Sequence, residues 1–117
     1  MKVEVPHPLS RELAELIAKR FRVLSEPTRI RLLDQLREGP ASVTELQRAT
    51  GSSQQNVSKH LGVLHDAGLV SRTPEGNLAR YAIADQSVFE LCELVCGGIE
   101  RQLGELEQLL QGERESK

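Results

Sequence analysis

Hydrophobic positions recur at helical spacing along most of this chain and alternate in one segment. Apolar residues return every three or four positions over residues 9–24, 27–37 and 85–110, which predicts three amphipathic helices. In residues 78–84, Tyr81 and Ile83 alternate with polar or small neighbours, as in a half-buried strand. A turn at 74–77 joins this strand to another at 69–73. The pattern predicts a mainly α protein with a small β-hairpin.

Residues 52–70 combine an apolar face with a polar one on a single predicted helix. We expect Ser52 to cap this helix, with Gln55 reaching back to it in a capping box. Val57, Leu61 and Leu64 share one face and pack on a core. The opposite face carries small or hydrogen-bonding residues, namely Gln54, Gln55, Ser58, Lys59 and Gly62. Amides can bond adenine edges and lysine can reach guanine or phosphate, so this face suits a DNA major groove. The alternative is an ordinary exposed helix face.

A second capping box lies directly upstream, where Ser42 and Glu45 open a short helix that Thr50 and Gly51 end. Two short helices joined by a tight glycine turn form a helix-turn-helix, whose second helix enters the major groove. The hairpin that follows is then a wing. Its Arg72 and Arg80 are expected to reach flanking phosphates or a minor groove, and the alternative is a solvated hairpin with two surface arginines.

Several segments together resemble the ArsR/SmtB family of bacterial repressors. They are SEPTRIRLL at 25–33, VTEL at 43–46, NVSKHLGVL at 56–64 and AGLV at 67–70, and the resemblance runs from about Leu13 to Ile83. It implies a winged helix-turn-helix homodimer that binds double-stranded operator DNA and releases it when an effector binds. Within the family's pattern His60 either contacts backbone phosphate or packs. The predicted DNA-contacting residues are Ser53, Gln54, Gln55, Asn56, Ser58, Lys59, His60, Arg72 and Arg80.

Charge is unevenly distributed along the 117 residues, although the net charge is only −2. Residues 1–84 hold 12 Lys and Arg against 9 Asp and Glu, whereas residues 85–117 hold 3 against 8. The predicted C-terminal helix therefore carries most of the excess acidic residues, and we expect it to face away from the phosphates of DNA. Because the basic surplus is small, operator binding should depend on salt less steeply than in strongly basic regulators.

The chain length is typical of one domain. We expect an extended arm at 1–8, a single DNA-binding and dimerisation domain at 9–111, and a frayed tail at 112–117. No apolar run approaches the roughly 18 residues that span a bilayer, and the first residues lack the apolar segment of a signal peptide. We therefore expect a cytoplasmic protein with no membrane partner.

The last predicted helix has an apolar stripe longer than one wing domain can cover. It contains Val88, Leu91, Cys92, Val95, Ile99, Leu103, Leu106 and Leu110. Such a stripe needs a partner, so we predict a homodimer formed through this helix, with the first helix joining in. The alternative is a helix folded back on its own domain. Gly97–Gly98 indicates either a bend or a close approach between helices.

Enzyme motifs are absent from the sequence, which has no glycine-rich phosphate loop, nucleophile elbow or His-Glu-x-x-His pair. Two other classes stay open: a winged helix used only for protein interaction, and a small redox or metal-buffering protein. Two metal sites known in the family are missing, since residues 44–50 contain no Cys and no His follows Asp85.

Cys92 and Cys96 lie four residues apart, so their side chains share one helix face. One interpretation is structural, because free Cys often packs as a small hydrophobe. The other is a thiol sensor in which both thiolates bind a soft metal or metalloid ion, such as trivalent arsenic, with further sulfur from a second chain. Oxidation or persulfide chemistry that bridges two chains is the rival form of sensing.

Overall fold

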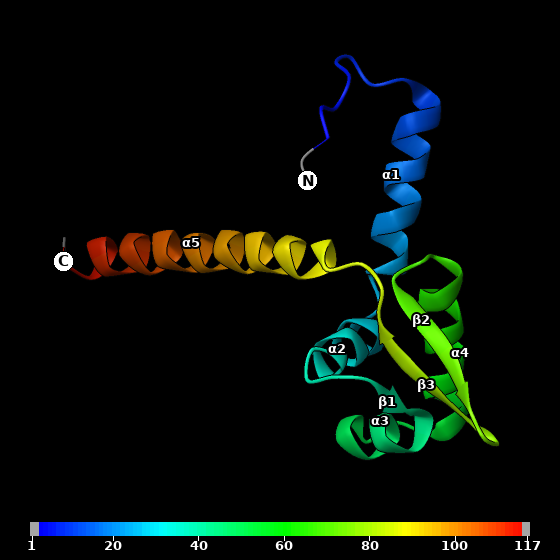
Figure 1. Cartoon of the computed structure of the whole chain (residues 1–117). Coiled ribbons are helices and arrows are strands. Elements are labelled where there is room, and N and C mark those ends of the chain that lie inside the picture. The colour runs from blue at the N-terminus through cyan, green and yellow to red at the C-terminus, as the bar shows by residue number, and fades with distance from the viewer. Residues whose placement is uncertain (1–2, 116–117) are drawn as a thin grey trace. The chain divides into compact units, whose positions relative to one another are not determined.

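The computed structural model describes residues 3–115 of the chain and divides into two compact units, one ending at Ala84 and the other beginning at Asp85. The first unit contains α1 (Arg11–Val23), α2 (Pro27–Leu36), β1 (Ala41–Ser42), α3 (Val43–Thr50), α4 (Gln54–Asp66), β2 (Val70–Glu75) and β3 (Leu78–Ile83). The second consists of α5 (Ser87–Glu115) (Figure 1). The predicted mainly α fold with a small sheet is confirmed. The single domain over residues 9–111 stays a prediction.

Serine side chains start three of the helices. Ser10 accepts a hydrogen bond from the backbone N–H of Leu13 at 3.1 Å, and Ser42 accepts one from Glu45 at 3.2 Å. The predicted cap at Ser42 is therefore confirmed. The predicted cap at Ser52 is wrong by one residue, because Ser53 has the extended backbone that precedes the first helical residue and accepts from the N–H of Asn56.

The core of the first unit lies where α2, α3, α4 and the sheet meet. Its nearly inaccessible apolar side chains are Leu32, Leu33, Leu36, Leu46, Val57, Leu61, Leu64, Leu69 and Val70. Burying one leucine or valine side chain contributes about 1.5–3 kcal/mol relative to leaving it in water. Leu and Val therefore supply the packing on which α4 is mounted.

The sheet has three antiparallel strands in the order β1-β3-β2, one more than the predicted hairpin. Strand β1 pairs Ala41 with Tyr81 and Ser42 with Arg80. Two residues are too few to show an alternating pattern, so the sequence did not indicate this strand. Strand β2 also continues through Pro74 and Glu75, and the turn is confined to residues 76 and 77, with Gly76 at a φ of 61°.

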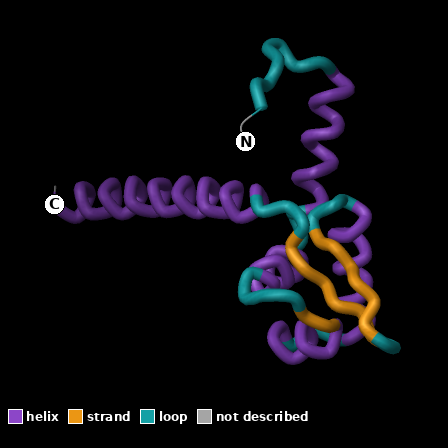
Figure 2. The backbone as a smooth tube through the Cα atoms, in the orientation of Figure 1, coloured by secondary structure: helices purple, strands orange, loops and turns teal. Residues whose placement is uncertain are grey.

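Helix α1 buries none of its residues, and its Leu16 and Phe21 are exposed. Figure 2 shows this helix extending away from the helices and sheet of its own unit. Hydrophobic packing therefore contributes little to holding α1 against the rest of the first unit, so the polar bonds of α1 matter more.

Helix α5 begins where Asp85 accepts hydrogen bonds from the backbone N–H and the hydroxyl of Ser87, at 3.0 and 2.6 Å. It continues through Gly97 and Gly98 and reaches Glu115, five residues beyond the predicted end at Leu110. The predicted tail at 112–117 therefore starts inside the helix, and its last two residues lie outside the described part. No helix among residues 3–115 is long and apolar enough to cross a membrane.

Candidate DNA-binding site

Helices α3 and α4 are joined by a tight turn whose geometry depends on two adjacent residues. Gly51 has a φ of 72°, the left-handed conformation, and its N–H donates to the carbonyl of Gln47 at 2.9 Å. Thr50 is only 7% exposed, and its hydroxyl donates to the carbonyl of Leu46 at 2.8 Å. The sequence placed the end of this helix at Thr50 and Gly51, but it gave no sign of the Thr50 hydrogen bond, because only the folded turn shows that the hydroxyl is buried and bonded.

The outward surface of α4 carries Gln54, Gln55, Ser58 and Lys59, all exposed, and we call these four residues the recognition face. Among residues 3–112, whose side chains the structure describes, no hydrogen bond or ion pair engages any of these four side chains. Gly62 continues this surface without a side chain. The buried surface of the same helix consists of Val57, His60, Leu61 and Leu64. The helix is thus anchored through one side, and the polar groups of the other remain available to a ligand.

Ser53 and Asn56 lie at the N-terminal end of α4. Ser53 is exposed, and its hydroxyl oxygen accepts the Asn56 N–H at 3.1 Å. Asn56 is half-buried. Both therefore contribute to the start of α4.

His60 lies on the other side of α4, in the core, with 6% of its surface exposed. Its Nδ1 accepts a hydrogen bond from Nε of Arg29 at 3.1 Å. Burial, with the neighbouring Arg29 charge as a second cause, holds the pKa of His60 below its ordinary 6.5, so the imidazole is neutral at pH 7. Of the two roles expected for His60, packing matches this position, and the structure does not bring it together with the recognition face.

The two wing arginines point to opposite faces of the hairpin. Arg72 is paired with Tyr81, whereas Arg80 is the neighbour of Tyr81 along β3, and successive side chains alternate across a strand. Arg80 forms ion pairs with Glu75 on β2 and with Glu45 on α3, the latter at 3.4 Å. Arg72 is exposed, and no such bond engages its side chain within the described range. On the wing, Arg72 is therefore the arginine whose guanidinium has no bond to another described residue.

Arg48, in the last turn of α3, is also exposed, and the sequence analysis did not include it. The first helix of a helix-turn-helix crosses the DNA backbone, where a basic side chain meets phosphate. The position of Arg48 on the polar side of a short amphipathic helix is the sequence feature that could have identified it.

The two cysteines lie on α5, with Cys92 half-buried and Cys96 exposed, and both are free thiols. Among the described side chains, those of residues 3–112, no group of three or more His, Cys, Asp or Glu is placed to hold a metal ion. A site built on these thiols would need ligands from elsewhere.

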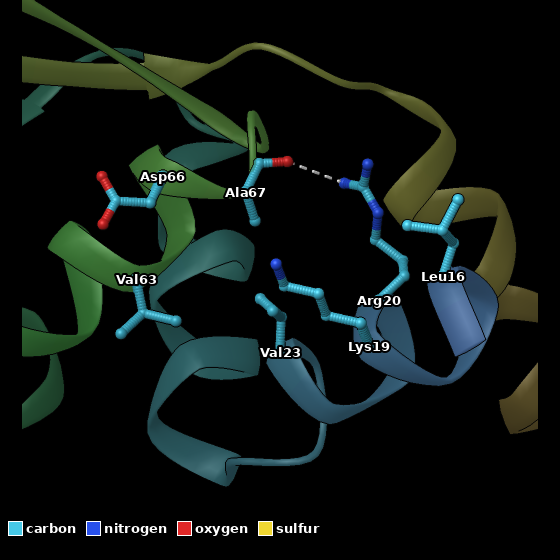
Figure 3. A pocket seen from close by; sticks show the side chains of 7 residues that line it. All are labelled: Leu16, Lys19, Arg20, Val23, Val63, Asp66 and Ala67. Carbon is cyan, nitrogen blue, oxygen red and sulfur yellow. Dashed lines mark hydrogen bonds between the residues drawn. The ribbon is translucent and has the colours of Figure 1, made fainter. Parts of the chain in front are cut away.

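A groove of about 630 Å³ lies between α1 and the C-terminal part of α4. Figure 3 shows the Arg20 side chain crossing from α1 toward Ala67, and its Nη1 donates to the Ala67 carbonyl at 3.0 Å. Leu16, Val23 and Val63 provide apolar lining. This bond ties α1 to the end of α4.

Comparison with known proteins gives consistent similarities. A family profile described as a helix-turn-helix domain matches residues 24–73. The transcriptional regulator NmtR of Mycobacterium tuberculosis is 37% identical over 86 residues, 74% of this chain and 72% of NmtR. The crystal structure of the AntR antimony-specific transcriptional repressor is similar, with a TM-score of 0.73 and 32% identity over 87% of this chain and 93% of that one.

The homodimeric winged helix-turn-helix domain of Mb0332 from Mycobacterium bovis, described as a possible ArsR-family regulator, has a TM-score of 0.65 and 31% identity. The similarity covers 84% of this chain and 94% of that domain. The expected resemblance and fold are thereby confirmed. On these similarities and on its own helix-turn-helix and wing, the chain belongs to the ArsR/SmtB family of winged helix-turn-helix transcriptional regulators.

Proposed function

We propose that this protein represses transcription by binding an inverted repeat in double-stranded operator DNA as a homodimer, with α4 of each protomer in a major groove. The observation that carries the proposal is the recognition face, whose four polar side chains are exposed while the opposite side of α4 is buried. An exposed helix surface without internal partners keeps its full hydrogen-bonding capacity for DNA.

The residue types divide between base recognition and anchoring. The amides of Gln54 and Gln55 can each bond an adenine edge with two hydrogen bonds, and the small Ser58 permits close approach. Lys59 supplies charge to phosphate or guanine. Ser53 and Asn56, at the N-terminal end of α4, are assigned to DNA phosphate contacts, and Arg72 extends the contact from the wing to flanking phosphate.

The second protomer is expected to pack on α5. Apolar residues recur every three or four positions along α5 and form a line that we call the α5 row: Val95, Ile99, Leu103, Leu106 and Leu110. Each of these side chains is between 46% and 56% exposed. A row of this length left in water is unfavourable, and a second copy of the helix covers it with the same residues. The Mb0332 domain, described as homodimeric, supports a homodimer for this chain as well.

Genomic footprinting with purified protein tests the proposal. A discrete palindromic protected site with half-sites about one helical turn apart is expected. If the protein protects no discrete site, the winged helix is an interaction module for another protein, which is the competing interpretation.

The effector is proposed to act at Cys92 and Cys96. The thiols lie one helical turn apart, and the exposure of Cys96 makes it accessible to a soft ion or an oxidant. Because the described residues offer no third ligand nearby, the remaining sulfur would come from the partner protomer. The name of AntR, an antimony-specific repressor, supports a soft metalloid as one class of effector. The competing possibility is that the cysteines are purely structural and the regulator has no small effector.

A further inference from the structure

One polar junction in the first unit connects three helices through a single guanidinium. Arg29 lies in the first turns of α2, and its Nε donates to Nδ1 of His60 on α4 at 3.1 Å. Its Nη1 donates to the carbonyl of Val23, the last residue of α1, also at 3.1 Å. The junction therefore joins the end of α1, the start of α2 and the middle of α4.

The chemistry of the junction fixes the state of the imidazole. A guanidinium has only donors, so Nδ1 of His60 must carry a lone pair, and the neutral imidazole then carries its proton on Nε2. Three charged groups act on this ring: Arg29 and Glu26 from the start of α2, and Lys59 from α4 itself. The Glu26 carboxylate is held by the N–H of Thr28 at 3.1 Å and partly offsets the positive charge of Arg29.

The position of His60 relates this junction to the recognition face. His60 follows Lys59 directly and points into the core, while Lys59 points outward. Val57, Leu61 and Leu64 also face inward, but their apolar contacts are non-directional. The Arg29–His60 hydrogen bond is directional, and rotating α4 about its axis would misalign or lengthen it.

We infer that Arg29 and His60 are positioning residues that fix the rotation of α4 and thereby aim its recognition face at the bases. The inference rests on the proposed function, because it concerns how α4 is held for DNA binding. The pair touches no DNA itself. It acts through the orientation of Gln55 and Ser58, which lie on the same helix.

The junction also connects α1 to α4. Helix α1 buries no residue, so its attachment to α4 depends on polar bonds. One runs from the Val23 carbonyl through Arg29 to His60, and the other from Arg20 to the Ala67 carbonyl (Figure 3). Two polar links therefore join α1 to the recognition helix.

The test compares four proteins: wild type, His60→Asn, His60→Leu and Arg29→Met. The Oδ1 of asparagine can occupy the place of the imidazole Nδ1 and accept from Arg29, whereas leucine cannot accept. Affinity is measured for a duplex carrying the footprinted site and for a scrambled duplex of equal length. We expect His60→Leu and Arg29→Met each to reduce affinity for the site about tenfold. His60→Asn should stay within about threefold of wild type.

Binding to the scrambled duplex serves as the control for folding, because backbone contacts need the fold but tolerate a small rotation of α4. It should remain near the wild-type value in all three variants. If Arg29→Met keeps full preference for the site, the inference is overturned. If His60→Leu fails to fold, the comparison of Arg29→Met with His60→Asn decides.

A second readout does not involve DNA. Long-range ¹H–¹⁵N spectra of the imidazole should show His60 with an unprotonated Nδ1 at pH 7, and Arg29→Met should shift that nitrogen signal. A protonated Nδ1 in wild type would contradict the junction directly. If wild type shows this signal but prefers no DNA site, the junction exists while the proposed function, and the role in aiming α4, are both wrong. If wild type prefers the footprinted site and all three variants keep that preference, the inference is overturned while the proposed function stands.

Discussion

The guanidinium of Arg80 lies 3.4 Å from the carboxylate of Glu45, which joins the wing to the first turn of α3. A second ion pair, with Glu75, holds the same guanidinium to the neighbouring strand. Arg80 is thereby occupied within the protein, and Arg72, on the opposite face of the hairpin, is the wing residue that keeps its charge for a ligand.

This difference predicts unequal effects of replacing the two arginines. Arg72→Ala should weaken binding to all DNA sequences and reduce the slope of log affinity against log salt by about one unit, because one phosphate contact is lost. Arg80→Ala should change the slope by much less and lower the unfolding free energy by at most about 1 kcal/mol, the usual value of a solvent-exposed ion pair. Titrations between about 50 and 200 mM salt measure both slopes. Equal slope changes would show that Arg80 leaves its carboxylates to bind DNA.

The α5 row predicts a specific loss of dimerisation. Leu103→Glu places a charge in the row and should convert the dimer to monomers, with operator affinity falling by at least about tenfold because two half-sites are no longer bound together. Leu94→Glu is the matched control, since Leu94 is exposed on α5 but lies outside the row. Analytical ultracentrifugation gives the result, and a Leu94→Glu protein as monomeric as Leu103→Glu would argue against the row as the interface.

His60 predicts a loss of stability toward acid. Because its pKa is below 6.5 in the folded protein, the unfolded chain binds a proton there in a range where the folded chain does not. The unfolding free energy should therefore fall as pH falls below about 6.5.

The pKa of Glu26 is below its ordinary 4.5, chiefly through the N–H of Thr28, so that group stays ionised above about pH 5.5. Thermal unfolding between about pH 8 and pH 5.5 should show a smaller loss for His60→Asn, and identical pH profiles would refute the assignment to His60.

The cysteines predict a response to thiol ligands. Arsenite, cadmium, zinc and a persulfide donor are tested separately, and at least one should lower the operator affinity of wild type without affecting the Cys92→Ser, Cys96→Ser double variant. Releasing DNA requires only a few kcal/mol of preference for the unbound arrangement. Operator affinity with and without each reagent is the measurement. Unchanged wild-type affinity in every case would identify the pair as structural.

Local patterns predicted α4 and its recognition face because helical periodicity and capping depend on residues within one or two turns. The buried Val57, Leu61 and Leu64 follow from that spacing alone. The cap was misplaced by one residue because Ser52 and Ser53 are chemically equivalent in sequence, and only the backbone conformation separates them.

Contacts between distant residues were not predictable in the same way. The Arg29–His60 bond joins positions 31 apart, and the Arg80–Glu45 pair joins β3 to α3. A lone charged residue gives no signal of its partner in one sequence. His60 and Arg80 were expected to contact DNA because they lie in the predicted recognition helix and wing. In the fold, His60 is buried and Arg80 is ion-paired, whereas Lys59 and Arg72 are exposed.

The most direct test of base recognition by α4 is the affinity of Gln55→Ala for the footprinted operator, for operators with one base pair changed in each half-site, and for scrambled DNA. The account predicts that Gln55→Ala loses discrimination at one position of each half-site, by about 1–3 kcal/mol, while its affinity for scrambled DNA stays close to that of wild type. A variant that loses the same factor on all three kinds of duplex would contradict the claim that the recognition face reads bases.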